Sequence, residues 1–378
     1  MIPITRLKLP KPEDMYDDFR KIISSGRLTM GPYLKEFEEK LSKYADVKHV
    51  VTTNSCTQGI TIALRASGII GRVLTTPFTY IATASAIKAA NLDIVFADID
   101  RETFNLDPDA VRKAQKNDIT ISAIVPVHVF GNPADIQGMW GVAGDFGASV
   151  IWDSAHACGS EYHMRKVGGF EMCDVFSFAP TKSCCTFEGG AILTEHDDIA
   201  EKARSLTRLG LPQNIDFQSD DRHFTEIGYN SRMSEIHALL GIKTLEMLDD
   251  SVSSREKSVA LYRKELVDTG LVFQKQEPHT VSANFAFPVI VDKEKIGITR
   301  EELQTELKKK EIETRHIWFF PCIHKQPAYS GYASLSFPNA EYVSNNILCL
   351  PLWSEMKNEE VIEVCNAIKR IVSLRRYV

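Results

Sequence analysis

The sequence predicts an α/β fold, with a mainly parallel mixed sheet between helices and a smaller C-terminal α+β domain. Short runs rich in β-branched and aromatic residues alternate with helix-compatible stretches up to about residue 248. This alternation is typical of a parallel sheet covered on both faces. A chain of 378 residues is also too long for one ordinary core. We therefore expect a large domain at 1–248 and a small domain at 249–378.

The N-terminal part is expected to begin with helices and to continue as alternating strands and helices. Apolar residues recur at helical spacing over 15–44, and a loop containing glycine and proline interrupts them at 26–32. A strand at 49–53, a polar turn and a helix to about residue 67 follow. Ligands of such sheets bind at the carboxyl ends of the strands. The further predicted strands are 73–75, 93–96, 121–127, 150–152, 175–178 and 191–194.

The C-terminal part has a different pattern. A long charged helix is predicted over 234–266, followed by a strand at 284–291 whose alternation predicts one solvated face. Two helices, an amphipathic one at 300–310 and another at 358–372, complete the chain. This order is typical of an α+β domain.

Composition excludes several classes of protein. With 44% hydrophobic residues, 25% charged residues and a net charge of −6, there is no electrostatic reason to expect nucleic acid or an anionic membrane as partner. No apolar run approaches the roughly 18–20 residues that span a bilayer. The first residues lack the apolar segment of a signal peptide, so we expect a cytoplasmic protein. Eight cysteines show no metal-type spacing, which predicts free thiols and no metal site.

The most informative residues are Asp153 and Lys182, each of which follows a predicted buried strand. A single lysine is usually a solvated surface group. A lysine and a carboxylate at one sheet edge, however, are the two groups that a protein needs to hold pyridoxal phosphate (PLP). The amine forms a Schiff base, and the acid keeps the pyridine nitrogen protonated. The protonated ring is then an electron sink, so the pair predicts carbanion chemistry.

Other candidate residues allow two interpretations each. The segment 54–57 between a strand and a helix offers hydroxyls, backbone N–H groups and a helix dipole to a phosphate, but Ser55 or Thr57 could simply cap the helix. Ser177 could add a hydroxyl to that site or be a packed polar residue. Tyr80 could stack on a cofactor ring or lie in the core. His156 is either a structural histidine or a hydrogen-bond partner of the cofactor's phenolic oxygen.

Nearly end to end, the chain resembles the DegT/StrS family of PLP-dependent sugar aminotransferases, which have the fold-type-I aminotransferase architecture. Each motif alone is weak, and their order and spacing make the resemblance specific. The motifs are GRLTMG (26–31), NSCT (54–57), PFTYIAT (77–83), PVHVFGNPADI (126–136), DSAHACG (153–159), FSFAPTK (176–182), EGGAI (188–192) and GYNSRM (228–233).

The resemblance implies a role for each matching residue. Lys182 corresponds to the lysine that holds PLP and moves protons, and Asp153 to the partner of the pyridine nitrogen. His156 corresponds to the contact of the phenolic oxygen, and Tyr80 to the stacked aromatic. Asn230 corresponds to an asparagine that reaches the neighbouring subunit's phosphate, which implies a homodimer with shared sites. The implied phosphate cradle consists of Ser55, Cys56, Thr57 and Ser177.

The chain departs from the family pattern at two positions. Cys56 stands where the family usually has glycine, which could alter a close backbone approach to the phosphate. Phe187 stands before EGG where many members have glycine. The TFEGG variant is similar to the branch that makes 4-amino-4,6-dideoxyglucose nucleotides.

The implied reaction transfers an amino group from L-glutamate to a nucleotide-linked 4-keto-6-deoxyhexose, giving an amino sugar for surface polysaccharides or glycosides. The segment 314–329 resembles perosamine synthases and provides Arg315, His324 and Tyr329 as candidates for substrate binding. These residues could equally be core and surface of the small domain. The choice between dTDP and GDP stays open, and a 3-keto sugar is the alternative substrate.

Three other functions compete with this one. A related branch of PLP-dependent 3-dehydratases replaces the lysine by histidine, which the presence of Lys182 argues against. A PLP-binding regulator without catalysis is disfavoured by the intact Asp153 and Lys182. An NAD-dependent oxidoreductase is disfavoured because no GxGxxG motif follows an early strand.

Overall fold

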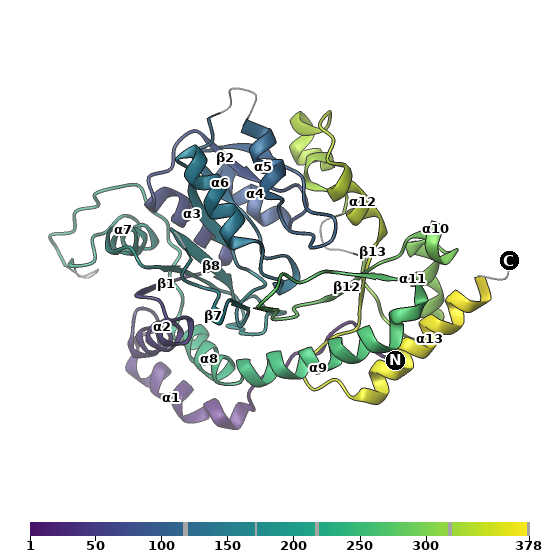
Figure 1. The fold of residues 1–378 in the computed structure, drawn as a ribbon. Helices are drawn as coiled ribbons and strands as arrows, with labels where there is room; N and C mark the ends of the chain where they lie inside the picture. The colour runs from purple at the N-terminus through teal and green to yellow at the C-terminus, as the bar shows by residue number, and fades with distance from the viewer. Residues whose placement is uncertain (116–119, 171, 216–218, 317–319, 376–378) are drawn as a thin grey trace.

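The computed structural model describes residues 1–115, 120–170, 172–215, 219–316 and 320–375 (Figure 1). Its centre is a seven-stranded sheet with the order β1-β9-β8-β5-β4-β2-β3. Neighbours from β8 through β3 are parallel, and β9 runs antiparallel to both β8 and β1. The predicted mainly parallel sheet is therefore confirmed. Its strands are β1 (His49–Thr53), β2 (Arg72–Thr75), β3 (Asp93–Phe96), β4 (Ala123–Val125), β5 (Ser149–Asp153), β8 (Cys173–Ser177) and β9 (Gly190–Thr194).

Helices cover both faces of this sheet, and a separate hydrophobic core lies under each layer. Successive residues of β8 show the arrangement, because Val175 belongs to one core and Phe176 to the other. Both side chains are fully buried, which explains why the strands are continuously apolar in the sequence. One layer contains α3 (Cys56–Ala66), α4 (Ile81–Ala89) and α7 (Asp197–Thr207), and the other contains α2 (Pro32–Ala45), α5 (Pro108–Gln115), α6 (Ile136–Phe146) and α8 (Glu235–Glu246).

The predicted helix–loop–helix at the N-terminus is confirmed as α1 (Tyr16–Ser25) and α2. The carboxylate of Glu235, at the start of α8, holds the loop in place. It accepts hydrogen bonds from the backbone N–H groups of Gly31 at 2.9 Å, Tyr33 at 3.0 Å and Leu34 at 3.1 Å. Since these are otherwise unpaired groups of the first turn of α2, a buried anion there caps the helix.

A second, antiparallel sheet follows in the C-terminal part. It consists of β10 (Val272–Phe273), β12 (Phe287–Ile290) and β13 (Ile347–Leu350). The helices α11 (Arg300–Lys309) and α13 (Asn358–Arg375) pack on it around a third core. The predicted solvated face of the 284–291 strand is wrong, since all of β12 is buried. Phe287 faces the third core while Ile290 joins a core of the large sheet, so both faces are covered.

The long charged helix predicted at 234–266 is two helices, α8 and α9 (Leu248–Leu266), which meet at Met247. Helix α9 runs along the lower edge of the molecule, between α8 and α13 (Figure 1). Its first turns contribute Val252 to a core of the large sheet, and its later turns contribute Tyr262 to the third core. Because one helix serves both cores, the division of the chain at residue 248 stays a prediction.

The remaining elements are short, apart from α12. A small sheet joins β6, β7 and β11, and it links the loop after β5 to the segment before β12. The bounds are β6 (Glu161–Tyr162), β7 (Arg165–Lys166), β11 (Thr280–Val281), α10 (Lys293–Ile296) and α12 (Pro338–Asn346), with 3-10 turns at Pro12–Met15, Val129–Gly131, Val267–Thr269, Ile323–Lys325 and Pro327–Tyr332.

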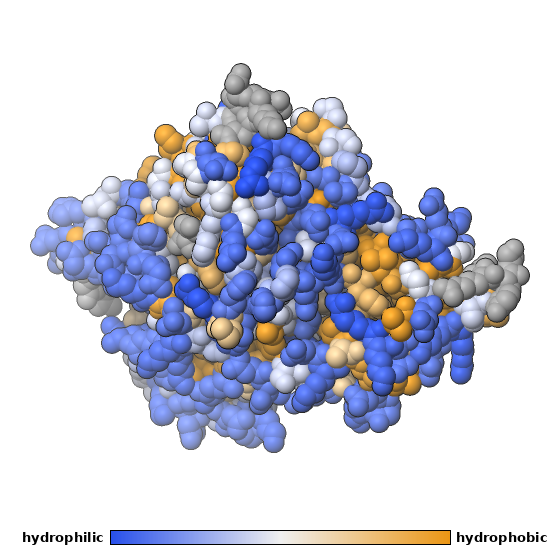
Figure 2. All heavy atoms as spheres, viewed as in Figure 1, coloured by the Kyte–Doolittle hydropathy of each residue, from blue (hydrophilic) through white to orange (hydrophobic). Residues whose placement is uncertain are grey.

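The visible surface is mostly hydrophilic, with hydrophobic residues in separate groups (Figure 2). Among the described residues, no helix is long and apolar enough to cross a bilayer. All eight cysteines are free, and only Cys56 is not fully buried. The described part of the chain also contains no cluster of three His, Cys, Asp or Glu side chains arranged to hold a metal ion.

Candidate functional site

A cavity of about 430 Å³ opens at the carboxyl edge of the large sheet. Asp153 ends β5 and Ser177 ends β8, and these neighbouring parallel strands bring both side chains to the same edge. Lys182 lies in the loop that follows β8. The structure thus gathers most of the predicted site residues: Ser55, Cys56, Thr57, Tyr80, Asp153, His156, Ser177 and Lys182 all line this cavity.

The carboxylate of Asp153 is held by two hydrogen bonds. The hydroxyl of Thr83 donates to Oδ2 at 2.7 Å, and the backbone N–H of Ala155 donates to Oδ1 at 3.1 Å. Thr83 in turn lies 2.9 Å from the Thr79 hydroxyl. Burial raises the pKa of Asp153, whereas these two hydrogen bonds and the charge of Lys182 lower it. A buried, oriented carboxyl of this kind is suited to pair with a cationic group in the cavity.

The amine of Lys182 lies inside the cavity, 4.2 Å from the centre of the Phe285 ring. Burial lowers the pKa of Lys182 to about 8, and the nearby Cys56 and Asp153 oppose this shift. A solvated lysine titrates near 10.5, so this amine is neutral, and hence nucleophilic, at a much lower pH.

The N-terminus of α3 forms the opposite wall. Ser55 is its N-cap, with Oγ accepting from the N–H of Gln58 at 3.2 Å. Ser55 also lines the cavity, beside Thr57, so the capping role and the cavity-lining position coexist. The backbones are close here, because a Cβ on Gly190 would lie 2.6 Å from the amide nitrogen of Cys56. The wall therefore combines a helix N-terminus with hydroxyls, as an anion site requires.

The two departures from the family pattern have different structural consequences. Cys56 is the first residue of α3, and its thiol lies 3.7 Å from the carbonyl oxygen of Val175, so the side chain packs toward β8. Phe187 has φ +67°, a conformation that glycine adopts without strain. Its ring is 50% exposed and makes an edge contact with His237 at 5.8 Å.

The ring of His156 is oriented by its surroundings. Its Nδ1 accepts from the backbone N–H of Phe130 at 3.3 Å. Burial, together with the charge of Lys182, places the pKa of His156 well below its ordinary value. The imidazole is therefore neutral with its proton on Nε2, which makes that nitrogen a donor.

Tyr80 lies at the rim of the cavity and is 51% exposed, so it is not a core residue.

Sequence reasoning missed three residues that build the site. Thr79 and Thr83 belong to the PFTYIAT motif, and their spacing of four residues at a helix start was a signal that could have linked them. Phe285 reaches the cavity from the segment before β12. No local pattern in the sequence distinguishes Phe285 from Phe287, the other aromatic residue of the predicted strand 284–291.

Four predicted site residues do not line this cavity. Asn230 is exposed, and its side-chain oxygen accepts from Arg232. Arg315 is exposed and pairs through its backbone with β13, and residues 317–319 of its segment lie outside the described part. The substrate-binding role of that segment stays a prediction.

The other two candidates of that segment are buried in this chain. His324 has no exposed area, and its Nε2 lies 2.9 Å from the carboxylate of Glu341. Tyr329 is 8% exposed, with its hydroxyl 3.1 Å from that of Ser85. Both positions match the alternative in which these side chains belong to the core.

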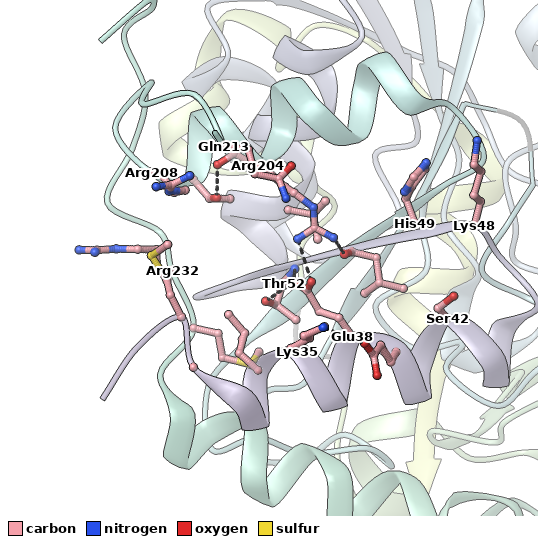
Figure 3. Close-up of a pocket in the computed structure, with 18 residues that line it drawn as sticks. Lys35, Glu38, Ser42, Lys48, His49, Thr52, Arg204, Arg208, Gln213 and Arg232 are labelled. Carbon is pink, nitrogen blue, oxygen red and sulfur yellow. Dashed lines mark hydrogen bonds and ion pairs between the residues drawn. The ribbon is translucent and has the colours of Figure 1, made fainter. Parts of the chain in front are cut away.

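A second cavity, of about 410 Å³, lies between α2, β1 and α7. Figure 3 shows Arg204 reaching toward Glu38 at its centre. The two side chains form an ion pair at 2.8 Å, and the other carboxylate oxygen of Glu38 accepts from the N–H and hydroxyl of Thr52. These charges satisfy one another and tie the three elements together. None of the predicted site residues lines this second cavity.

Known proteins are similar to this chain in sequence and fold. The model of the DegT/DnrJ/EryC1/StrS aminotransferase family matches residues 11–369. A dTDP-4-amino-4,6-dideoxy-D-glucose transaminase from Escherichia coli is 33% identical over 96% of both chains, and a GDP-perosamine synthase from Vibrio cholerae is 29% identical over 98% of both. The crystal structure of NtdA from Bacillus subtilis with bound cofactor PMP has a TM-score of 0.86 and 25% identity, covering 96% of this chain and 82% of that one.

Proposed function

Because the chain belongs to the DegT/DnrJ/EryC1/StrS aminotransferase family, we propose that it transfers an amino group from L-glutamate to a nucleotide-linked 4-keto-6-deoxyhexose with the help of PLP. The observation that carries this proposal is one cavity holding the amine of Lys182, the carboxyl of Asp153 and the N-terminus of α3. The product would be a 4-amino-4,6-dideoxyhexose nucleotide. The eight free thiols support a reducing compartment, the cytoplasm, as the place of reaction.

The residues of the cavity fit PLP in number and chemistry. Its volume of about 430 Å³ lies in the range of small-molecule sites, about 300–1,000 Å³. Lys182 would hold the aldehyde carbon, Asp153 the pyridine nitrogen, and Ser55 with Thr57 the phosphate. The Nε2–H of His156 would donate to the phenolic oxygen. The PMP-bound relative supports this assignment, since PMP is the aminated form of PLP. When bound, PLP supplies an electron sink for the charge that develops on the substrate carbon.

The chain's own residues provide positioning and proton transfer. Asp153, fixed by Thr83 and Ala155, would keep the ring nitrogen protonated through charge pairing in a buried site. Once its amine is free, Lys182 would remove the proton from the carbon that bears the amino group of glutamate and later return a proton to the sugar carbon. A pKa of about 8 suits a group that must accept and donate protons near neutral pH.

The position of amination is proposed from the relatives. The relatives are a dTDP-4-amino-4,6-dideoxy-D-glucose transaminase and a GDP-perosamine synthase, and both names support a 4-amino sugar. The two names carry different nucleotides, so the nucleotide is left to experiment. A 3-keto-6-deoxy sugar nucleotide is the alternative substrate.

A coupled assay tests the function. Purified protein with PLP and glutamate is supplied with 4-keto-6-deoxy and 3-keto-6-deoxy sugar nucleotides, and NMR locates the new amine. We expect amination at position 4, and no turnover by Lys182→Ala. A Lys166→Ala variant is the control, because Lys166 forms ion pairs with Glu161 and Asp249 at the surface. Amination at position 3 alone, or of no sugar nucleotide, contradicts the proposed substrate. Normal turnover by Lys182→Ala contradicts the proposed mechanism.

We further propose a homodimer in which Asn230 completes the partner's site. The exposure of Asn230, outside its own chain's cavity, supports this arrangement. Mixing inactive Lys182→Ala and Asn230→Ala chains should restore activity, because one site of each heterodimer then carries neither substitution. If heterodimers form and stay inactive, the sites are not shared.

A further inference from the structure

Phe285 enters the cavity from the segment that leads into β12. Its ring centre lies 4.1 Å from that of His156, and the two planes differ by 7°. The amine of Lys182 lies 4.2 Å from the same ring centre. One aromatic ring therefore contacts both the candidate nucleophile and the candidate donor to the phenolic oxygen.

The backbone holds this ring in place through the loop that also orients His156. The N–H of Phe285 donates to the carbonyl oxygen of Phe130 at 2.9 Å, and the N–H of Phe130 donates to Nδ1 of His156 at 3.3 Å. Next to it, the N–H of Ala283 donates to the carbonyl oxygen of Gly131 at 3.2 Å. A Cβ on Gly131 would lie 2.7 Å from the carbonyl oxygen of His156, so the three segments are closely packed.

We propose that Phe285 is a positioning residue: its ring binds the ammonium form of Lys182 and orients the His156 imidazole by stacking on it. This inference rests on the proposed function, in which Lys182 holds PLP. The face of an aromatic ring attracts a cation through its quadrupole, and stacking restricts the imidazole plane. The Phe285 ring therefore binds the Lys182 amine whenever that amine is protonated and not attached to the cofactor.

The contact has a measurable electrostatic consequence. A cation–π contact favours the charged amine, whereas burial favours the neutral one, so the ring opposes the effect of burial on Lys182. Contacts of this type, from exposed to desolvated, correspond to a shift of about 0.4–1.5 pKa units. Removing the ring should therefore lower the pKa of Lys182 by that amount.

The test titrates Lys182 in the full-length protein without cofactor. Competitive labelling with acetic anhydride over a range of pH, followed by mass spectrometry of the Lys182 peptide, gives the pKa of this amine directly. Phe285→Leu removes the ring, and Phe285→Tyr keeps it. Incorporation of 3,4,5-trifluorophenylalanine at position 285 keeps the shape of the phenyl ring but weakens its quadrupole. This variant tests the contact even if Phe285→Leu does not fold. Phe287→Leu is the matched control, since Phe287 stacks on Tyr262 in the third core.

We expect the Lys182 pKa to fall in Phe285→Leu and in the fluorinated protein, and to stay unchanged in Phe285→Tyr and Phe287→Leu. An unchanged pKa in the fluorinated protein, or an equal fall in Phe285→Tyr, overturns the inference. PLP binding to the unmodified protein, followed by its absorbance, is measured separately. If PLP does not bind while the pKa pattern holds, the proposed function fails, whereas the contact between the Phe285 ring and the Lys182 ammonium stands.

Discussion

Replacing Thr83 by valine should destabilise the protein through Asp153. Valine has nearly the shape of threonine but lacks the hydroxyl that donates to Oδ2 of Asp153 at 2.7 Å. Thr83 is 1% exposed and Asp153 is 5% exposed, so the substitution removes a donor from a largely buried carboxyl group. A buried hydrogen bond to a charged group contributes about 1.5–3 kcal/mol. We therefore expect the free energy of unfolding to fall by about 1.5–3 kcal/mol at pH 7.

Thr83→Ser is the matched control, because it keeps the hydroxyl and loses only a methyl group, at a cost of about 1 kcal/mol. Urea unfolding of the cofactor-free protein measures both variants. The hydrogen bond holds the pKa of Asp153 below the value that burial alone would set. Its contribution is thus present while the carboxylate is ionised and is lost as the pH falls. Equal stability of the valine and serine variants at pH 7 would show that the Thr83 hydroxyl does not stabilise the protein through Asp153.

Two further predictions concern Asp174 and Phe187. Burial raises the pKa of Asp174 from 3.8 to about 7, so the folded state binds this proton more tightly than the unfolded chain, and stability should fall between these pH values as the pH rises. The Asp174→Asn variant should lose this pH dependence, which changes the free energy of unfolding by up to about 4 kcal/mol. Urea unfolding of both proteins at pH 4 and pH 7 measures it, and an equal change of stability with pH in the variant would contradict the prediction. Phe187 has φ +67°, so the Phe187→Gly variant should be more stable than Phe187→Ala by about 1 kcal/mol. Thermal unfolding of both variants measures the difference, and a more stable alanine variant would contradict the prediction.

The strands of the large sheet could be predicted because they are buried on both faces and stand out as apolar runs between helices. The segment 49–53 matches β1 at both ends. The prediction was less accurate where tertiary packing decides the structure. The strand at 284–291 alternates in sequence, yet its second face is covered by a core of the large sheet. The helix predicted at 234–266 breaks at Met247, where the chain passes from one core toward another.

The sequence was enough to place Asp153 and Lys182 at one edge of the sheet, because each follows a strand and parallel neighbours end at the same edge. It also determined the helix N-terminus at residues 55–57. Which other groups reach these two residues depends on tertiary packing. Thr83 and Phe285 come to the cavity from a helix start and from the segment before β12, far from Asp153 and Lys182 along the chain. His324 is in turn removed from the cavity by burial beside Glu341. Local sequence patterns record which face of an element is apolar, whereas contacts between distant segments depend on how those faces pack together.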